Sequence, residues 1–116
     1  VALDSAMLSR DPAVGLDYDR DPLNYRGPFR RETLRTLTSG AREVRGRWSD
    51  LAVPMLVLHG GDDAIVPALA SEELHAAARS ADRTLDVLPG LRHEILNEPE
   101  GPDLVRRIAR WMADRI

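Results

Sequence analysis

Along the second half of the chain, short apolar runs alternate with segments in which apolar residues recur at helical spacing. A continuous apolar run, 55–58, is followed after His59 by a pair of glycines, and a largely apolar segment, Thr-Leu-Asp-Val-Leu at 84–88, ends at a Pro-Gly pair. Short apolar runs bounded by such turn residues are typical of buried strands. Between and after them, apolar residues recur every three or four positions, as in amphipathic helices. This half is therefore predicted to form strands over about 54–59 and 83–88, and helices over about 67–78 and from Pro102 onward.

The first half of the chain is predicted to be helical and interrupted by turns. Asp11 followed by Pro12 is the pattern of an N-cap with proline in the first turn, which predicts a short helix over about 12–18. Further along, four apolar residues lie three or four positions apart with arginines between them. This spacing predicts a second helix over about 29–44, although Gly40 weakens the expectation for its last turns.

A strand–helix–strand unit of this length is parallel and places both carboxyl ends of its strands at one edge of the sheet. We therefore predict a single incomplete α/β domain, in which 54–116 form a βαβα unit and 1–53 form a helical segment. Asp62 and Asp63 follow the first strand, and His93 follows the second. Because neighbouring strands are about 5 Å apart, an acid can reach the histidine. Parallel sheets normally have several strands, so further strands are expected outside this chain.

Composition limits the function but does not identify it. The chain has 116 residues, 43% hydrophobic and 30% charged, with a net charge of −3 and no cysteine. The negative charge argues against nucleic acid as a partner, and the missing cysteines exclude disulfides and thiolate metal sites. No apolar run approaches the roughly 20 residues that span a bilayer. Because the chain begins Val-Ala-Leu-Asp rather than with Met, we expect it to be a piece of a longer protein.

An acid that holds a histidine is the orienting part of a nucleophilic triad. The acid sets the tautomer of the imidazole, and the histidine takes a proton from the nucleophile. In α/β-hydrolases the chain order is nucleophile, acid, histidine, with the nucleophile in a Gly-x-Ser-x-Gly turn. Asp62 or Asp63 and His93 have the second and third places in that order, but the turn motif does not occur in this sequence. The nucleophile is therefore expected upstream of this chain.

Two longer runs, Val53 to Pro67 and Leu88 to Pro99, resemble the carboxyl-terminal part of an α/β-hydrolase. The similarity is to the monoacylglycerol lipase or lysophospholipase-like group, the serine aminopeptidase S33 type. It covers almost the whole chain but only about the last 40% of a complete family member. By resemblance the catalytic acid is Asp63 and the catalytic histidine is His93. The family hydrolyses monoacylglycerol or lysophospholipid-type esters without metal or organic cofactor.

This resemblance also implies partners and a location. The chain would act with the missing N-terminal part of the same hydrolase on a small acyl ester or lipid. The expected location is cytoplasmic, and peripheral membrane contact through the family's cap is left open. Since the serine and the oxyanion hole match nothing here, the chain alone is expected to be inactive. Two alternatives are an epoxide hydrolase or dehalogenase with an aspartate nucleophile, and a non-catalytic interaction domain of hydrolase ancestry.

The other polar candidates are expected to have structural or solvent-exposed roles. His59 is interpreted as a structural histidine at a strand end, and His75 as a surface residue of a helix. Glu94 and Glu98 could hydrogen-bond to the backbone near the histidine loop, but we expect them to be solvated. Of the two aspartates, one should face His93 while the other faces solvent or caps the backbone of residues 64–66, and the resemblance favours Asp63 for the histidine.

Overall fold

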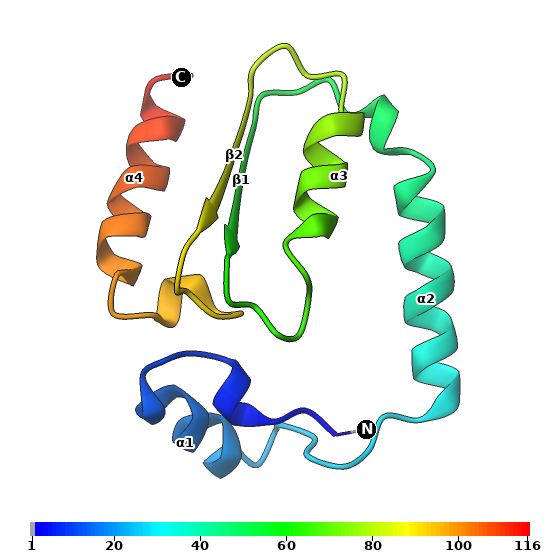
Figure 1. Ribbon diagram of the computed structural model, residues 1–116, viewed down its shortest axis with the longest axis vertical. Helices are drawn as coiled ribbons and strands as arrows, with labels where there is room; N and C mark the ends of the chain where they lie inside the picture. Colours follow the sequence, from blue (N-terminus) through cyan, green and yellow to red (C-terminus); the bar gives the residue numbers. More distant parts are fainter. Residues whose placement is uncertain (1) are drawn as a thin grey trace.

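The computed structural model describes residues 2–116, and its elements follow the predicted order (Figure 1). Helical elements come first, where η denotes a short 3-10 helix, and the strands come in the second half. In chain order they are η1 (Ser5–Met7), α1 (Pro12–Arg20), α2 (Arg31–Arg45), η2 (Trp48–Asp50), β1 (Met55–Gly60), α3 (Leu69–Ala77), β2 (Arg83–Leu88), η3 (Ile95–Asn97) and α4 (Gly101–Ala113). The α/β class is confirmed.

The predicted element bounds lie within two residues of those in the structure, and two helices show the local effects that set them. The Pro67 carbonyl accepts a hydrogen bond from the Ala70 amide at 3.0 Å, so a tight turn precedes α3 and the helix proper begins at Leu69. In α2 the helix continues through Gly40 to Arg45. The cost of one helical glycine, about 1 kcal/mol, is too small to end a helix that otherwise continues.

The sheet consists of β1 and β2, which pair in parallel from Met55 opposite Arg83 to Gly60 opposite Leu88. Helix α3 connects them and contacts both strands. Figure 1 shows α3 on one side of the strand pair and α4 on the other. The N-terminal segment with η1 and α1 lies across the carboxyl ends of the strands (Figure 1). These ends are therefore covered by a segment that is distant in sequence.

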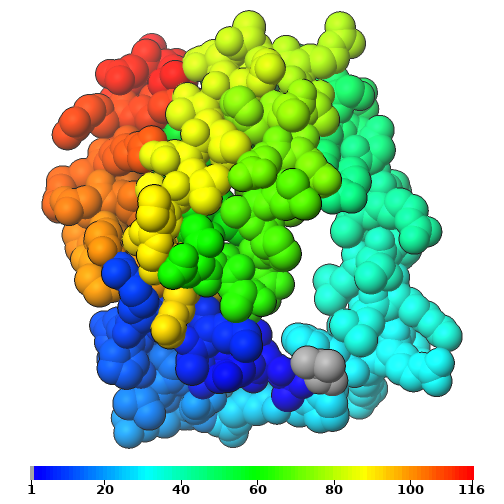
Figure 2. Space-filling model, in the orientation of Figure 1, coloured from blue at the N-terminus to red at the C-terminus, as the bar shows by residue number. Residues whose placement is uncertain are grey.

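The core of the described residues is small. The buried apolar side chains are those of Leu8, Ala78, Leu91 and Leu104. Apolar side chains on α2 stay exposed, among them Leu37 and Val44, which are 59% and 60% accessible. Figure 2 shows α2 standing apart from α3 over much of its length. No helix among residues 2–116 is both long and apolar enough to cross a membrane; the longest, α2, has 15 residues.

We expect the purified 116-residue chain to bind a hydrophobic dye and to self-associate. An apolar groove runs between β1 and α4, lined by Met55, Leu58, Trp111 and Met112 among others. Contiguous apolar patches of this kind are uncommon on monomeric proteins and favour association. Dye fluorescence and light scattering as a function of protein concentration measure both effects. A monodisperse monomer that leaves the dye dark would contradict the expectation.

Candidate active site

The loop after β1 holds Asp63 in a nearly buried position. The Asp63 amide donates to the Gly60 carbonyl at 3.2 Å. Its side-chain Oδ1 accepts hydrogen bonds from the amides of Ile65 at 2.8 Å and Val66 at 2.9 Å. Aspartate commonly closes a turn in this way, by accepting from amides further along its own loop. The side chain is only 3% exposed, so the turn aims Oδ2 in a defined direction.

The loop after β2 turns at Pro89 and Gly90 and runs back against the first loop. The Leu91 amide donates to the Leu88 carbonyl at 3.3 Å, and Gly90 has φ of +80°. Proline followed by a positive-φ glycine is typical of a type II turn. The Gly61 amide then donates to Leu88 at 2.7 Å, and the Asp62 amide donates to Leu91 at 2.9 Å. Backbone hydrogen bonds thus join the two loops.

This arrangement brings Asp63 and His93 into contact. His93 Nδ1 lies 2.9 Å from Asp63 Oδ2, within the hydrogen-bonding range expected from the sequence. Burial by itself would raise the pKa of the Asp63 carboxyl. Hydrogen bonds from Val66, His93 and Ile65 outweigh burial, so the pKa lies below its ordinary value. An ionised carboxylate only accepts hydrogen bonds, so His93 donates from Nδ1, and in the neutral imidazole this tautomer has its lone pair on Nε2.

His59 makes a second contact with the same carboxylate, which was not foreseen. Its Nε2 lies 2.8 Å from the Val66 carbonyl oxygen and 3.3 Å from Asp63 Oδ2, and its Nδ1 lies 2.7 Å from Ser71 Oγ. A carbonyl can only accept, so Nε2 donates and Nδ1 accepts from the serine hydroxyl. These contacts fit the structural role expected for His59, and they also place its ring against the acid.

The two aspartates face the directions expected, but Asp63 has a second role as well. We expected one to face the histidine and the other to face solvent or cap residues 64–66. Asp63 both faces His93 and caps the loop, one oxygen for each role, while Asp62 is exposed. A carboxylate has two oxygens and several lone pairs, so one residue can do both.

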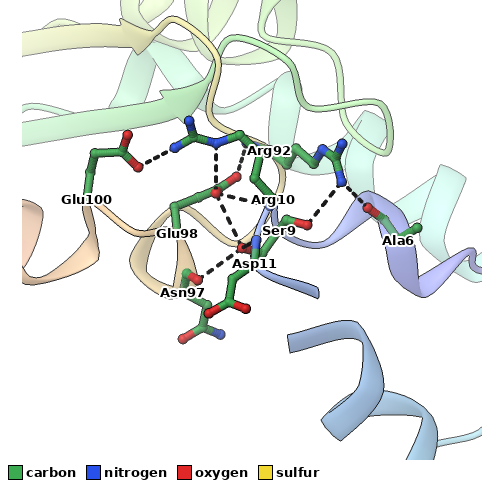
Figure 3. A network of polar contacts seen from close by, with 8 residues as sticks. All are labelled: Ala6, Ser9, Arg10, Asp11, Arg92, Asn97, Glu98 and Glu100. Atoms are coloured by element: carbon green, nitrogen blue, oxygen red, sulfur yellow. Dashed lines mark hydrogen bonds and ion pairs between the residues drawn. The ribbon is translucent and has the colours of Figure 1, made fainter. Parts of the chain in front are cut away.

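The expectation that Glu98 is solvated is wrong. Its side chain is fully buried and lies at the centre of the polar network in Figure 3. The Arg92 amide donates to Oε1 at 2.7 Å, and Ser9 and Arg10 donate to Oε2. Glu94 is half-buried, and its amide donates to the Leu8 carbonyl at 2.8 Å. Nothing local in the sequence signals the contacts with Ser9 and Arg10, because these donors come from the other end of the chain.

A small cavity of about 230 Å³ opens beside the pair. Its lining includes Leu58, Val66 and Ile95 together with Asp63 and His93. Apolar side chains and the acid–histidine pair therefore line the same cavity. Within residues 2–116, no three His, Asp or Glu side chains are grouped so that they could hold a metal ion.

A family model described as serine aminopeptidase, S33, matches residues 1–100. The chain belongs to the S33 family. The monoacylglycerol lipase of Mycolicibacterium smegmatis is 33% identical to this S33 chain over 114 residues, which are 98% of this chain and 41% of that protein. The caffeoylshikimate esterase of Arabidopsis thaliana is 28% identical over 99 residues, which are 83% of this chain and 30% of the esterase.

Comparison with solved structures confirms the predicted family relationship and fold. The crystal structure of Paleococcus ferrophilus monoacylglycerol lipase superposes with a TM-score of 0.89 at 25% identity, covering all of this chain and 46% of that one. This S33 chain is therefore part of a monoacylglycerol lipase-like α/β-hydrolase fold. It spans less than half the length of the relatives it matches.

Proposed function

We propose that this chain supplies the acid and the histidine of a Ser-His-Asp triad in an ester hydrolase whose serine lies outside these 116 residues. The observation that carries the proposal is the 2.9 Å contact between His93 Nδ1 and Asp63 Oδ2 at the shared carboxyl edge of two parallel strands. Within residues 2–116 no hydrogen bond joins a serine to His93; Ser71, for instance, bonds to His59. We use the term complete hydrolase for the polypeptide that joins this chain to the serine-bearing segment.

In the proposed reaction His93 Nε2 removes the proton from the serine hydroxyl as the serine oxygen attacks the ester carbonyl. Asp63 stabilises the imidazolium that results, because its buried carboxylate already accepts from Nδ1. The imidazolium then gives its proton to the leaving alcohol, and an acyl-enzyme remains. Water attacks the acyl group next, His93 takes the water's proton, and the serine regains one as the acid leaves.

The proposed substrates are acyl esters of small alcohols, with monoacylglycerols first and lysophospholipids second. Two relatives are named monoacylglycerol lipases, and both cover nearly the whole of this chain. The relative named caffeoylshikimate esterase is also named for an ester, one with a different alcohol. Ester hydrolysis is common to these names, which favours it over epoxide or haloalkane chemistry.

The test compares the complete hydrolase with the 116-residue chain. The complete hydrolase should cleave a monoacylglycerol, and a serine-reactive phosphonate should abolish this activity. The chain alone should hydrolyse p-nitrophenyl butyrate no faster than free imidazole, because the nucleophile and the oxyanion hole provide most triad catalysis. In the complete hydrolase His75→Gln should leave the esterase activity unchanged, since this histidine lies in α3 and its Nε2 is 3.5 Å from the Arg83 carbonyl oxygen. An upstream turn centred on aspartate, with epoxide hydrolysis in place of esterase activity, would overturn the proposal.

A further inference from the structure

The segment that carries His93 has no regular secondary structure of its own. Residues 91–94 lie between β2 and η3, and their hydrogen bonds to distant residues define their path. The amides on both sides of the histidine are engaged: Arg92 donates to Glu98 Oε1 at 2.7 Å, and Glu94 donates to the Leu8 carbonyl at 2.8 Å. The placement of the imidazole depends on these two attachments.

Glu98 makes the first attachment and also binds the N-terminal segment. Its Oε2 accepts from the Arg10 amide at 3.1 Å, from Arg10 Nε at 3.0 Å and from Ser9 Oγ at 3.3 Å (Figure 3). The Arg92 guanidinium adds bonds to the carbonyls of Ala6 at 2.6 Å and Ser9 at 3.0 Å. One buried carboxylate therefore ties the histidine loop to the segment that covers the strand ends.

The carboxylate is ionised, as these contacts require. Burial would raise the pKa of Glu98. The hydrogen bonds from the Arg92 and Arg10 amides and from the Arg10 guanidinium outweigh burial, so this pKa lies below its ordinary value. The two oxygens accept four hydrogen bonds, all donated by other residues of the chain. A glutamine of the same size would have to turn an NH₂ group toward at least one of these donors, and an unpaired buried donor is costly.

We propose that Glu98 is a positioning residue that holds the His93 loop in the geometry needed for the bond to Asp63. This inference rests on the proposed function for its catalytic consequence, but not for its structural one. Glu98 does not contact the reacting atoms. It acts through the Arg92 amide, the residue next to the histidine.

The catalytic test is Glu98→Gln in the complete hydrolase. We expect kcat for p-nitrophenyl butyrate to fall about 10- to 100-fold, as when a catalytic group is displaced by up to about 1 Å, while KM changes less. Glu100→Gln is the matched control. Glu100 also pairs with Arg10, but its side chain is 46% exposed, and within residues 2–116 no side-chain hydrogen bond or ion pair joins it to residues 91–94. The kcat of Glu100→Gln should stay within about twofold of wild type, because a surface ion pair contributes little.

The second readout needs no substrate. In histidine-labelled protein, NMR follows the exchange of the His93 Nδ1 proton with water. In Glu98→Gln this exchange should be about tenfold faster or more, while the Val57 amide in β1 keeps its rate, because only the loop opens. Equal acceleration at both positions would mean a general loss of stability and would overturn the inference, as would no change at His93.

A milder variant keeps the inference testable if Glu98→Gln does not fold. Ser9→Ala removes a hydroxyl whose one proton is shared between Glu98 Oε2 at 3.3 Å and the Asn97 carbonyl at 3.0 Å. We therefore expect a smaller acceleration of His93 proton exchange in the same direction, and its absence would overturn the inference. The two proposals can fail separately. A complete hydrolase that cleaves no ester would refute the proposed function, yet the exchange measurements would still decide the role of Glu98.

Discussion

Replacing Asp63 by asparagine is expected to lower kcat of the complete hydrolase about 10³- to 10⁴-fold, the scale seen when the acid of a triad becomes its amide. The amide keeps the shape of the acid but has only one accepting oxygen. That oxygen is needed by the amides of Ile65 and Val66, which close the loop. The NH₂ group must then face His93 Nδ1, where an acceptor is required. The imidazole takes the wrong tautomer, with its proton on Nε2.

Asp62→Asn is the matched control for this variant. Asp62 is adjacent in sequence and exposed, and its amide rather than its carboxylate makes the bond to Leu91. Its replacement should cost no more than about tenfold in kcat, or roughly 1.4 kcal/mol. Measuring kcat and KM of both variants on a monoacylglycerol separates the two aspartates, and KM should change little. Equal activity of Asp63→Asn and wild type would refute the triad assignment.

The parallel strand pair and the contact at its edge could be predicted from local signals in the sequence. Apolar runs ended by Gly60 and Gly61 and by Pro89 and Gly90 identify the strands, and the right-handed crossover of a βαβ unit brings their carboxyl ends together. Neighbouring strands lie close enough for the hydrogen bond between Asp63 and His93, which the structure contains. The catalytic role of the pair stays a prediction.

The support around this pair could not be predicted in the same way. The side-chain and amide donors to Glu98 Oε2 come from Ser9 and Arg10, almost ninety residues away, and no periodicity reports such a contact. In the sequence, His59 is recognisable only as a residue at the end of a strand. Only the return of the chain at Val66 and Ser71 gives its two nitrogens their partners. Buried polar networks depend on tertiary packing, whereas sequence patterns report mainly local structure.

Helix α2 lies where the sequence predicts it, but its packing could not be predicted. The apolar spacing of α2 is genuine, and the helix forms where expected. Yet Leu37 and Val44 remain exposed, because among residues 2–116 no element covers them fully. A hydrophobic stripe predicts that a face is to be buried, but it does not identify the surface that buries it.

Gly60→Ala is expected to destabilise the complete hydrolase by roughly 3 kcal/mol or more, at or beyond the upper end of overpacking costs. A Cβ at this position would run into the backbone carbonyl oxygens of Leu91 and Arg92. Backbone atoms cannot rotate away as a flexible side chain can, so the two loops must separate. Because the acid follows Gly60 by three residues and the histidine follows Arg92 directly, separation also pulls the pair apart. Esterase activity should therefore fall with stability.

Gly40→Ala is the control, because this glycine lies inside α2 and a Cβ there would meet nothing within 4 Å. Alanine is the better helix former by about 0.8–1 kcal/mol, so this variant should be slightly more stable than wild type. Urea denaturation of both variants gives the two changes in the free energy of unfolding, with opposite signs expected. If Gly60→Ala were tolerated within about 1 kcal/mol, the ordinary effect of a single substitution, the loops would not be in backbone contact. The close approach that seats His93 beside Asp63 would then have to be abandoned.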